Sequence, residues 1–400
     1  MALLIHGGDV ISPVVAHGLI PDGAVLVDGG LIAWVGPMLD VPSNASIDRR
    51  IDAKGHVIAP GFIDLQLNGA AGRLFTSDPS PDAVLAMSAV LPQFGCTAFL
   101  PTAITAPIER LEEAGRAVKL ARAAETGGAR ILGIHFEGPF INPLRAGAHH
   151  RPFITAPSRD ALMRLWDASG GTLRLLTLAP ELPGSDEVIK GARELGITVA
   201  IGHTEARPEQ IARAAELGAT LVTHLFNAMA PLTSRDPGTV GGALIDGRLW
   251  VSVIVDGVHV HPVSLKVTIA SKTLGKIVLI TDGMPPIGAD ETSFMLDGQY
   301  IEVRDGACYR PDGVLAGSAL TMNRAVRNMN QLVGVPLKEA IELGSLNPAL
   351  AIGVADRKGS LEPGKDADIV IVDRDVEVYM TMIGGEIRYR AAEFEGETRA

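Results

Sequence analysis

Side chains that can bind metal ions or move protons recur at the ends of short apolar runs in this 400-residue sequence. They are Asp64, Gln66, Thr102, His135, Glu137, Glu181, His203, His224, Asp256, His259 and Asp282. Four of the ten histidines belong to this set. A single histidine in such a place is as often a structural residue as a ligand. Several ionisable groups brought together would repel or stay unpaired unless a metal ion or a substrate lay between them.

The residue types indicate which chemistry such a cluster performs. Two imidazoles and a carboxylate suit a borderline cation such as zinc and leave a position for water, while iron, cobalt or manganese are alternatives. A bound cation lowers the pKa of its water towards about 7. Asp282, after the last run, can take that proton and return it to a leaving group. The pattern therefore predicts metal-assisted amide hydrolysis.

The apolar runs predict an α/β fold. Eight of them have the character of buried strands, at 61–67, 96–102, 131–137, 173–179, 197–203, 220–226, 250–256 and 276–282. Helical patterns separate most of them, for example at 185–195, 208–217 and 262–274. Eight such units predict a (β/α)8 TIM-like barrel with its chemistry at the carboxyl ends of the strands. A doubly wound open sheet is the alternative, but no G-x-G-x-x-G follows the first strand.

The two ends of the chain differ from the middle. Both consist of short apolar runs cut by turn residues, with hairpin signals at Asp28-Gly29-Gly30 and Gly384-Gly385. We therefore expect a small β-sandwich domain formed by both termini, residues 1–59 with 360–400, beside a barrel domain at 60–359.

Composition restricts the partners. A formal net charge of -11 argues against nucleic acid. A phosphorylated small molecule remains compatible, because it needs only a local cluster of His and Arg. Cys96 and Cys308 match no metal or redox spacing, and so few cysteines fit a reducing cytoplasm. No signal peptide and no run of 18 apolar residues is seen, so we expect a soluble cytoplasmic protein without a membrane span.

Six short segments carry a family resemblance. They are PGFID at 60–64, HFEGPF at 135–140, IGHT at 201–204, THLFNAM at 223–229, DGVH at 256–259 and TDG at 281–283. In this order they resemble the N-acetylglucosamine-6-phosphate deacetylase family of the amidohydrolase superfamily, over nearly the whole chain. The segments around Glu137 and His224 are the most specific, since the one around Asp64 occurs throughout the superfamily.

The resemblance implies a role for each matching residue. Glu137, His203 and His224 would hold one divalent metal, and Asp282 would be the general acid and base. Substrate contacts would come from Ala148, His149, Asn227, Ala228, Arg235, His259, Leu315, Ala316 and Gly317. Arg235 matches a phosphate-binding arginine that acts across a dimer, so a homodimer is expected. The alternatives are a solvated loop for Arg235, a helix cap for Asn227 and a plain strand or turn for 315–317.

Two segments depart from related barrels. Many barrel amidohydrolases have His-x-His after the first strand, where this chain has Gln66-Leu67-Asn68. Because amides are poor zinc ligands, we expect one metal, with Gln66 and Asn68 marking a vestigial second position. The segment Gly283-Met284-Pro285-Pro286 replaces smaller residues and is expected to reshape the pocket.

The leading hypothesis is hydrolysis of N-acetyl-D-glucosamine 6-phosphate to D-glucosamine 6-phosphate and acetate. A deacetylase for the galactosamine epimer, or for a broader set of amino sugars, is the close alternative. N-Acyl-amino-acid deacylases and cyclic-amide hydrolases are more distant, since they commonly have His-x-His and a lysine at strand four, where this chain has Glu181. A catalytically inert barrel scaffold is disfavoured because the three ligands and Asp282 are all present.

Overall fold

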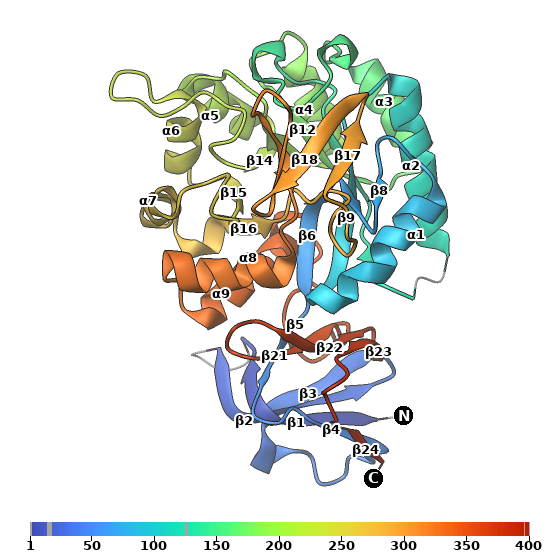
Figure 1. Ribbon diagram of the computed structural model, residues 1–400. Coiled ribbons are helices and arrows are strands. Elements are labelled where there is room, and N and C mark those ends of the chain that lie inside the picture. Colours follow the sequence, from blue (N-terminus) through green and yellow to red (C-terminus); the bar gives the residue numbers. More distant parts are fainter. Residues whose placement is uncertain (1, 14–17, 125–126, 396, 400) are drawn as a thin grey trace.

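A parallel barrel stands on a smaller β-rich unit in the computed structural model, which describes residues 2–13, 18–124, 127–395 and 397–399 (Figure 1). The barrel strands are β6 (Phe62–Leu67), β9 (Cys96–Ile104), β11 (Ile134–Glu137), β12 (Leu173–Leu178), β13 (Thr198–Ile201), β14 (Ala219–Val222), β15 (Trp250–Ile254) and β16 (Ile277–Ile280). They pair in parallel in this order, and a bridge from Leu67 to Gly283 joins the two ends. Each strand overlaps a predicted run, and the barrel is confirmed.

Helices cover the outside of the barrel (Figure 1). They are α1 (Pro81–Val90), α2 (Ile108–Ala123), α3 (Arg159–Ser169), α4 (Ser185–Glu194), α5 (Pro208–Leu217), α6 (Gly238–Ile245), α7 (Pro262–Lys272), α8 (Met322–Asn328), α9 (Leu337–Gly344) and α10 (Leu346–Ala351). Proline begins α1, α5 and α7, where its missing N–H costs no helical hydrogen bond. Within the described residues, none of the helices combines the length and apolar character that crossing a bilayer requires.

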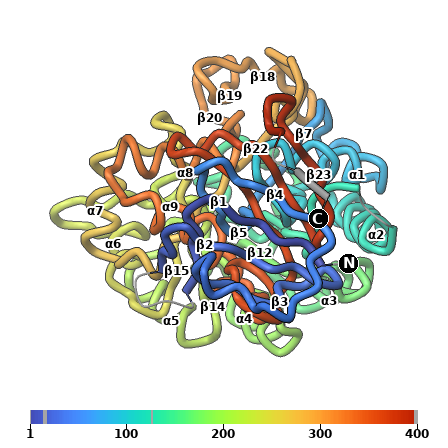
Figure 2. The backbone as a smooth tube through the Cα atoms, turned by 90° about the horizontal axis from the view of Figure 1, so that it is seen from below, coloured from blue at the N-terminus to red at the C-terminus, as the bar shows by residue number. Residues whose placement is uncertain are grey.

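The β-rich unit is built from both ends of the chain. Its strands are β1 (Leu3–Ile11), β2 (Leu19–Asp28), β3 (Leu31–Pro37), β4 (Arg49–Asp52), β5 (Val57–Pro60), β21 (Ile369–Val372), β22 (Val378–Ile383), β23 (Glu386–Arg390) and β24 (Glu397–Arg399). They form one hydrogen-bonded sheet around a separate apolar core, with β5 antiparallel to β21. Figure 2 shows strands from both ends of the chain, in blue and in red, together in this unit. Both predicted hairpins are present. The union of the termini is confirmed, while the boundaries at 59/60 and 359/360 stay predictions.

A second small sheet follows the last barrel strand. It contains β17 (Ser293–Leu296), β18 (Gln299–Arg304), β19 (Ala307–Tyr309) and β20 (Leu315–Ser318), all antiparallel (Figure 1). The sequence patterns did not predict this sheet, although a plain strand was one alternative for residues 315–317. Its strands are short and largely half-exposed, so they lack the continuous apolar runs that revealed the barrel.

Candidate active site

A cavity of about 380 Å³ lies at the carboxyl ends of the barrel strands. It brings together nearly all of the predicted site. The lining includes Asn68, Glu137, Ala148, His149, His203, His224, Asn227, Ala228, His259, Asp282, Leu315, Ala316 and Gly317. Among the predicted residues, Gln66 and Arg235 do not line it.

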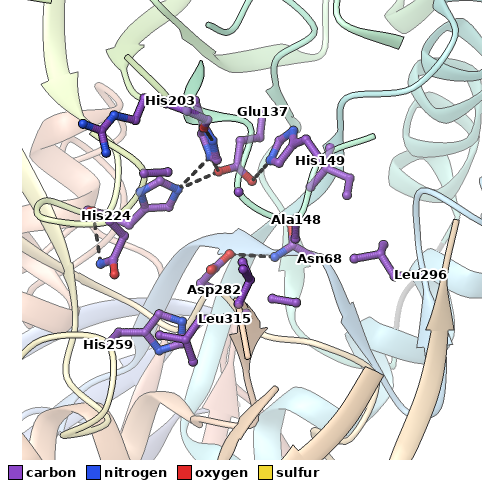
Figure 3. Close-up of a pocket in the computed structure, with 18 of the residues that line it drawn as sticks. Asn68, Glu137, Ala148, His149, His203, His224, His259, Asp282, Leu296 and Leu315 are labelled. Carbon is purple, nitrogen blue, oxygen red and sulfur yellow. Dashed lines mark hydrogen bonds and ion pairs between the residues drawn. The ribbon is translucent and has the colours of Figure 1, made fainter. Parts of the chain in front are cut away.

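Three side-chain atoms converge at one point in this cavity (Figure 3). Oε1 of Glu137 lies 2.8 Å from Nε2 of His224 and 3.0 Å from Nε2 of His203, and the two Nε2 atoms are 3.2 Å apart. All three residues are buried. Donor atoms that share one zinc ion at about 2.0–2.2 Å lie at similar separations, so the arrangement fits a divalent cation.

The tautomer of His203 supports the same interpretation. Its Nδ1 lies 2.8 Å from the backbone carbonyl oxygen of Arg145, which can only accept. Nδ1 therefore carries the proton and Nε2 presents a lone pair, as in histidines whose second nitrogen is fixed by a carbonyl group. The Nδ1 atom of His224 is buried without a hydrogen-bond partner in the described part of the chain.

His149 offers another combination, because Glu137, His149 and His203 also bring ligand atoms within 4.8 Å of one another. The backbone N–H of Thr105 donates to Nδ1 of His149 at 3.3 Å, so the lone pair is on Nδ1. Burial lowers the pKa of His149 to about 3, which leaves a neutral ring. Its one proton is then on Nε2, 3.8 Å from Oε2 of Glu137. This geometry favours His149 as a donor and His224 as the ligand.

Asp282 follows the last barrel strand, β16. It faces the three-atom cluster formed by Oε1 of Glu137 and Nε2 of His203 and His224 (Figure 3). Its Oδ1 accepts from Nδ2 of Asn68 at 2.7 Å and from Nε2 of Gln66 at 3.0 Å. Burial and the charge of Glu137 raise the pKa of Asp282, while nearby histidines and the Asn68 hydrogen bond oppose the rise. The two amides of the Gln66-Leu67-Asn68 segment therefore orient a carboxylate.

This contact gives a pH prediction. Replacing Asn68 with Ala removes a hydrogen bond that favours the ionised form of Asp282, so the pKa of Asp282 rises further. If ionised Asp282 is the active form, the acidic limb of the kcat/KM profile moves to higher pH. Steady-state rates measured across pH 5–9 for both proteins test this. An acidic limb at the wild-type position would exclude the role of this hydrogen bond.

His259 lies beyond Asp282, away from Glu137 (Figure 3). Its Nδ1 is 2.6 Å from Oδ2 of Asp256, and Oδ1 of Asp256 accepts the backbone N–H groups of Val258 and His259. Burial raises the pKa of Asp256, but the hydrogen bond and charge of His259 outweigh it and lower that pKa overall. An ionised Asp256 therefore fixes the His259 ring and leaves Nε2 as its free edge.

Five residues other than glycine that line the cavity have a left-handed backbone. The φ angles are +49° at His203, +32° at His224, +80° at Phe226, +49° at Ala228 and +50° at Asp282. For residues other than glycine this conformation costs about 1–3 kcal/mol and persists only where the surroundings enforce it. Such strain gathers at functional sites, and no sequence pattern had indicated it.

Some strand-end residues brace the barrel instead. Asp64 is fully buried and accepts from the Thr281 hydroxyl at 2.5 Å, linking the first and last strands, and burial raises the pKa of Asp64 to about 7. His135 bridges Thr102 and Thr177 inside the barrel at 3.2 and 2.8 Å. Burial lowers the pKa of His135 to about 4. Asp64 and His135 are therefore ionisable residues at strand ends that support the barrel and do not line the cavity.

Two predicted substrate contacts have a different setting from the rest. Arg235 is exposed in the segment 231–237 between β14 and α6, and it has no ion-pair partner in the described part of the chain. The amide nitrogen of Asn227 lies 3.3 Å from the carbonyl oxygen of His224, so this side chain also supports its own turn.

Sequence reasoning missed an apolar wall of the cavity. The wall consists of Leu74, Ile104, Met284 and Leu296, which pack with Ala316 in one buried cluster. Leu296 belongs to the unpredicted sheet. The unusual segment 283–286 was the one available signal, since it contains Met284.

Comparison with known proteins agrees with the fold. A model of the amidohydrolase family matches residues 57–388. The chain therefore belongs to the amidohydrolase family.

Individual relatives indicate which members of this family the chain resembles. It is 36% identical to N-acetylglucosamine-6-phosphate deacetylase of Bacillus subtilis (strain 168), over 96% of this chain and 97% of that one. It is 37% identical to N-acetylgalactosamine-6-phosphate deacetylase of Shewanella sp. (strain ANA-3), over 92% of both chains. A mutant N-acetyl-D-glucosamine-6-phosphate deacetylase from Mycobacterium smegmatis, solved with N-acetyl-D-glucosamine-6-phosphate, superposes with a TM-score of 0.89 at 31% identity, covering 97% of this chain and 99% of that one. The resemblance inferred from the six segments is confirmed.

Proposed function

We propose that this enzyme hydrolyses N-acetyl-D-glucosamine 6-phosphate to D-glucosamine 6-phosphate and acetate. The observation that carries the proposal is the convergence of Glu137, His203 and His224 opposite Asp282 in one cavity. The Bacillus subtilis relative and the Mycobacterium smegmatis complex support this choice of substrate.

The chain's own residues divide the work as follows. Glu137, His203 and His224 would hold one divalent cation, expected to be zinc. When bound, such a cation activates water and polarises the amide carbonyl. Asp282 accepts the proton of the attacking water as the new C–O bond forms. It then delivers that proton to the amide nitrogen as the C–N bond breaks, so that acetate and the free amine leave.

The remaining residues hold the substrate. The free Nε2 edge of His259 is suited to the carbonyl oxygen, since Asp256 would stabilise a protonated ring. The Nε2 proton of His149 points toward Oε2 of Glu137, on the metal-binding side of the cavity. Ala148, Asn227, Ala228 and the strand from Leu315 to Gly317 would enclose the sugar.

The phosphate group requires a cation, and among the residues that the structure describes the cavity lining contains no lysine and no arginine free of an ion pair. The lining contains a single arginine, Arg145, which is paired with Glu205. Arg235 is exposed. Exposed apolar side chains also occur in the same loop and on the neighbouring helices α6 and α7, namely Leu232, Ile245, Val263 and Val267. Exposed apolar side chains on neighbouring elements suit a subunit interface. We therefore infer a homodimer in which Arg235 of the partner subunit reaches the phosphate.

Arg235→Ala tests this arrangement. We expect KM for the phosphorylated substrate to rise about 10²-fold, since a charge-assisted contact contributes about 1.5–3 kcal/mol. KM for unphosphorylated N-acetylglucosamine should stay unchanged. Light scattering on a sizing column measures the dimer separately, and Lys119→Ala on α2, outside the elements assigned to the interface, is a matched loss of charge. Equal effects on both substrates, or a monomeric wild type, would contradict the role.

The sugar itself can be determined directly. Acetate release should be measured with both epimeric amino-sugar phosphates and with their unphosphorylated forms. The Shewanella relative makes the galactosamine epimer the second candidate. A kcat/KM higher for that epimer would replace glucosamine as the substrate, and equal rates without phosphate would remove the phosphate from the proposal.

Two features bear on the cellular location of the protein, its free cysteines and its proposed substrate. Cys96 and Cys308 are buried and unpaired, which suits a reducing compartment. We propose a cytoplasmic location, where sugar phosphates are metabolised.

A further inference from the structure

Glu181 lies behind His203 and does not line the cavity. It follows β12 and is half-buried. Its Oε1 accepts from Nδ2 of Asn142 at 2.8 Å and from the backbone N–H of Glu205 at 2.7 Å, while Oε2 accepts from the Thr204 hydroxyl at 2.5 Å. Three hydrogen bonds hold this carboxylate in a single orientation.

The first of these donors fixes the turn that orients His203. Asn142 precedes the short 3-10 turn η3 (Pro143–Arg145), and its Oδ1 accepts from the N–H of Leu144 at 2.9 Å. The backbone N–H of Asn142 donates to the carbonyl oxygen of His203 at 2.9 Å. The same turn supplies the Arg145 carbonyl that accepts the Nδ1 proton of His203. Its position therefore sets which nitrogen of His203 faces Glu137.

The other two donors fix the chain directly after His203. Thr204 also donates its N–H to the carbonyl oxygen of Ala228 at 3.2 Å, which ties it to the loop that follows His224. Glu205 forms an ion pair with Arg145 and so links the two segments a second time. His203 itself has φ of +49°, a conformation that needs support from both sides.

We propose that Glu181 is a positioning residue for the metal centre. It holds the segment 142–145 against 203–205, so that Nε2 of His203 meets Glu137 and His224 with its lone pair free. The inference rests on the proposed metal-binding role of His203. Glu181 acts through that histidine. It follows the fourth barrel strand, where more distant amidohydrolases commonly have a lysine.

Metal affinity is the direct test. Zinc Kd is measured for the purified full chain by competition with a chromophoric chelator, and the visible spectrum of the cobalt-loaded protein is recorded. We expect Glu181→Ala to weaken zinc binding about 10–100-fold and to change the cobalt bands, as loss of a group behind a ligand does. Glu181→Gln should recover most of the affinity, because its amide oxygen can accept from Asn142 and Glu205 while its nitrogen donates to Thr204.

Glu194→Ala is the matched control, since this exposed glutamate of α4 pairs only with Arg159 among the described residues. It should bind zinc like the wild type. Wild-type zinc affinity and cobalt bands in Glu181→Ala would overturn the proposal. If that variant does not fold, Thr204→Val removes a single donor, and unchanged zinc affinity there would overturn it equally. Both measurements use metal without substrate, so a wrong substrate assignment leaves their outcome intact.

Discussion

Asp282→Asn is expected to lower kcat by about 10²–10⁴-fold, the range that a positioned general acid and base contributes. Asparagine keeps the shape of the side chain and an oxygen that can accept from Gln66 and Asn68, so the cavity should stay intact. It cannot take a proton from water or return one to the leaving nitrogen. Acetate release under saturating substrate measures the loss.

Three controls make that result specific. Metal content measured by elemental analysis should equal that of the wild type, because Asp282 is outside the three-atom cluster. KM should change little, and the melting temperature should stay the same or rise, since a buried carboxylate is replaced by a neutral group. Retained activity in a metal-loaded Asp282→Asn enzyme would refute proton transfer by Asp282.

Removal of the cation is the second large effect expected. A chelated enzyme should lose at least about 10³-fold in kcat, because several kcal/mol of transition-state stabilisation disappear and each 1.36 kcal/mol is tenfold. Zinc should restore the rate at one equivalent per chain. If full activity required two equivalents of zinc per chain, a second metal would bind, and the expectation of a single metal would be wrong.

Stability should follow the same titration. Without the cation, the Nε2 atoms of His203 and His224 and the Glu137 carboxylate are crowded in a buried space. A ligand at 100 times its Kd stabilises the folded state by about 2.7 kcal/mol, so zinc should raise the melting temperature. Scanning calorimetry with zinc, iron, cobalt and manganese ranks the metals. A melting temperature that no metal changes would argue against this site.

Much of the barrel was predictable because its strands are buried on both faces. The run from Ile277 to Ile280 is apolar at every position, and the run around Val253 is nearly so. Polar residues after such strands must meet at one end, which predicted the positions of His203, His224 and Asp282. The sheet from Ser293 to Ser318 was not predictable in this way, since its strands alternate and are half-exposed.

The finer roles needed three-dimensional contacts. The sequence shows only that Gln66 and Asn68 are poor metal ligands. The structure shows that both side-chain amides donate hydrogen bonds to Oδ1 of Asp282. Likewise the sequence shows Glu181 only as a polar residue after a strand, while its three hydrogen-bond donors are 23 to 39 residues away along the chain. Long-range hydrogen bonds leave no periodic pattern, so spacing arguments cannot recover them.

The shared sheet of the two termini has a consequence for synthesis of the chain. Val57 to Pro60 pair with Ile369 to Val372, so the edge of β5 has no partner until the last strands are made. At about 5–20 residues per second, the roughly 300 residues between them take about 15–60 seconds to emerge. During that interval an apolar strand edge is open to wrong pairing. We therefore expect the yield of folded protein to depend on how well the nascent N-terminal segment is protected during that interval.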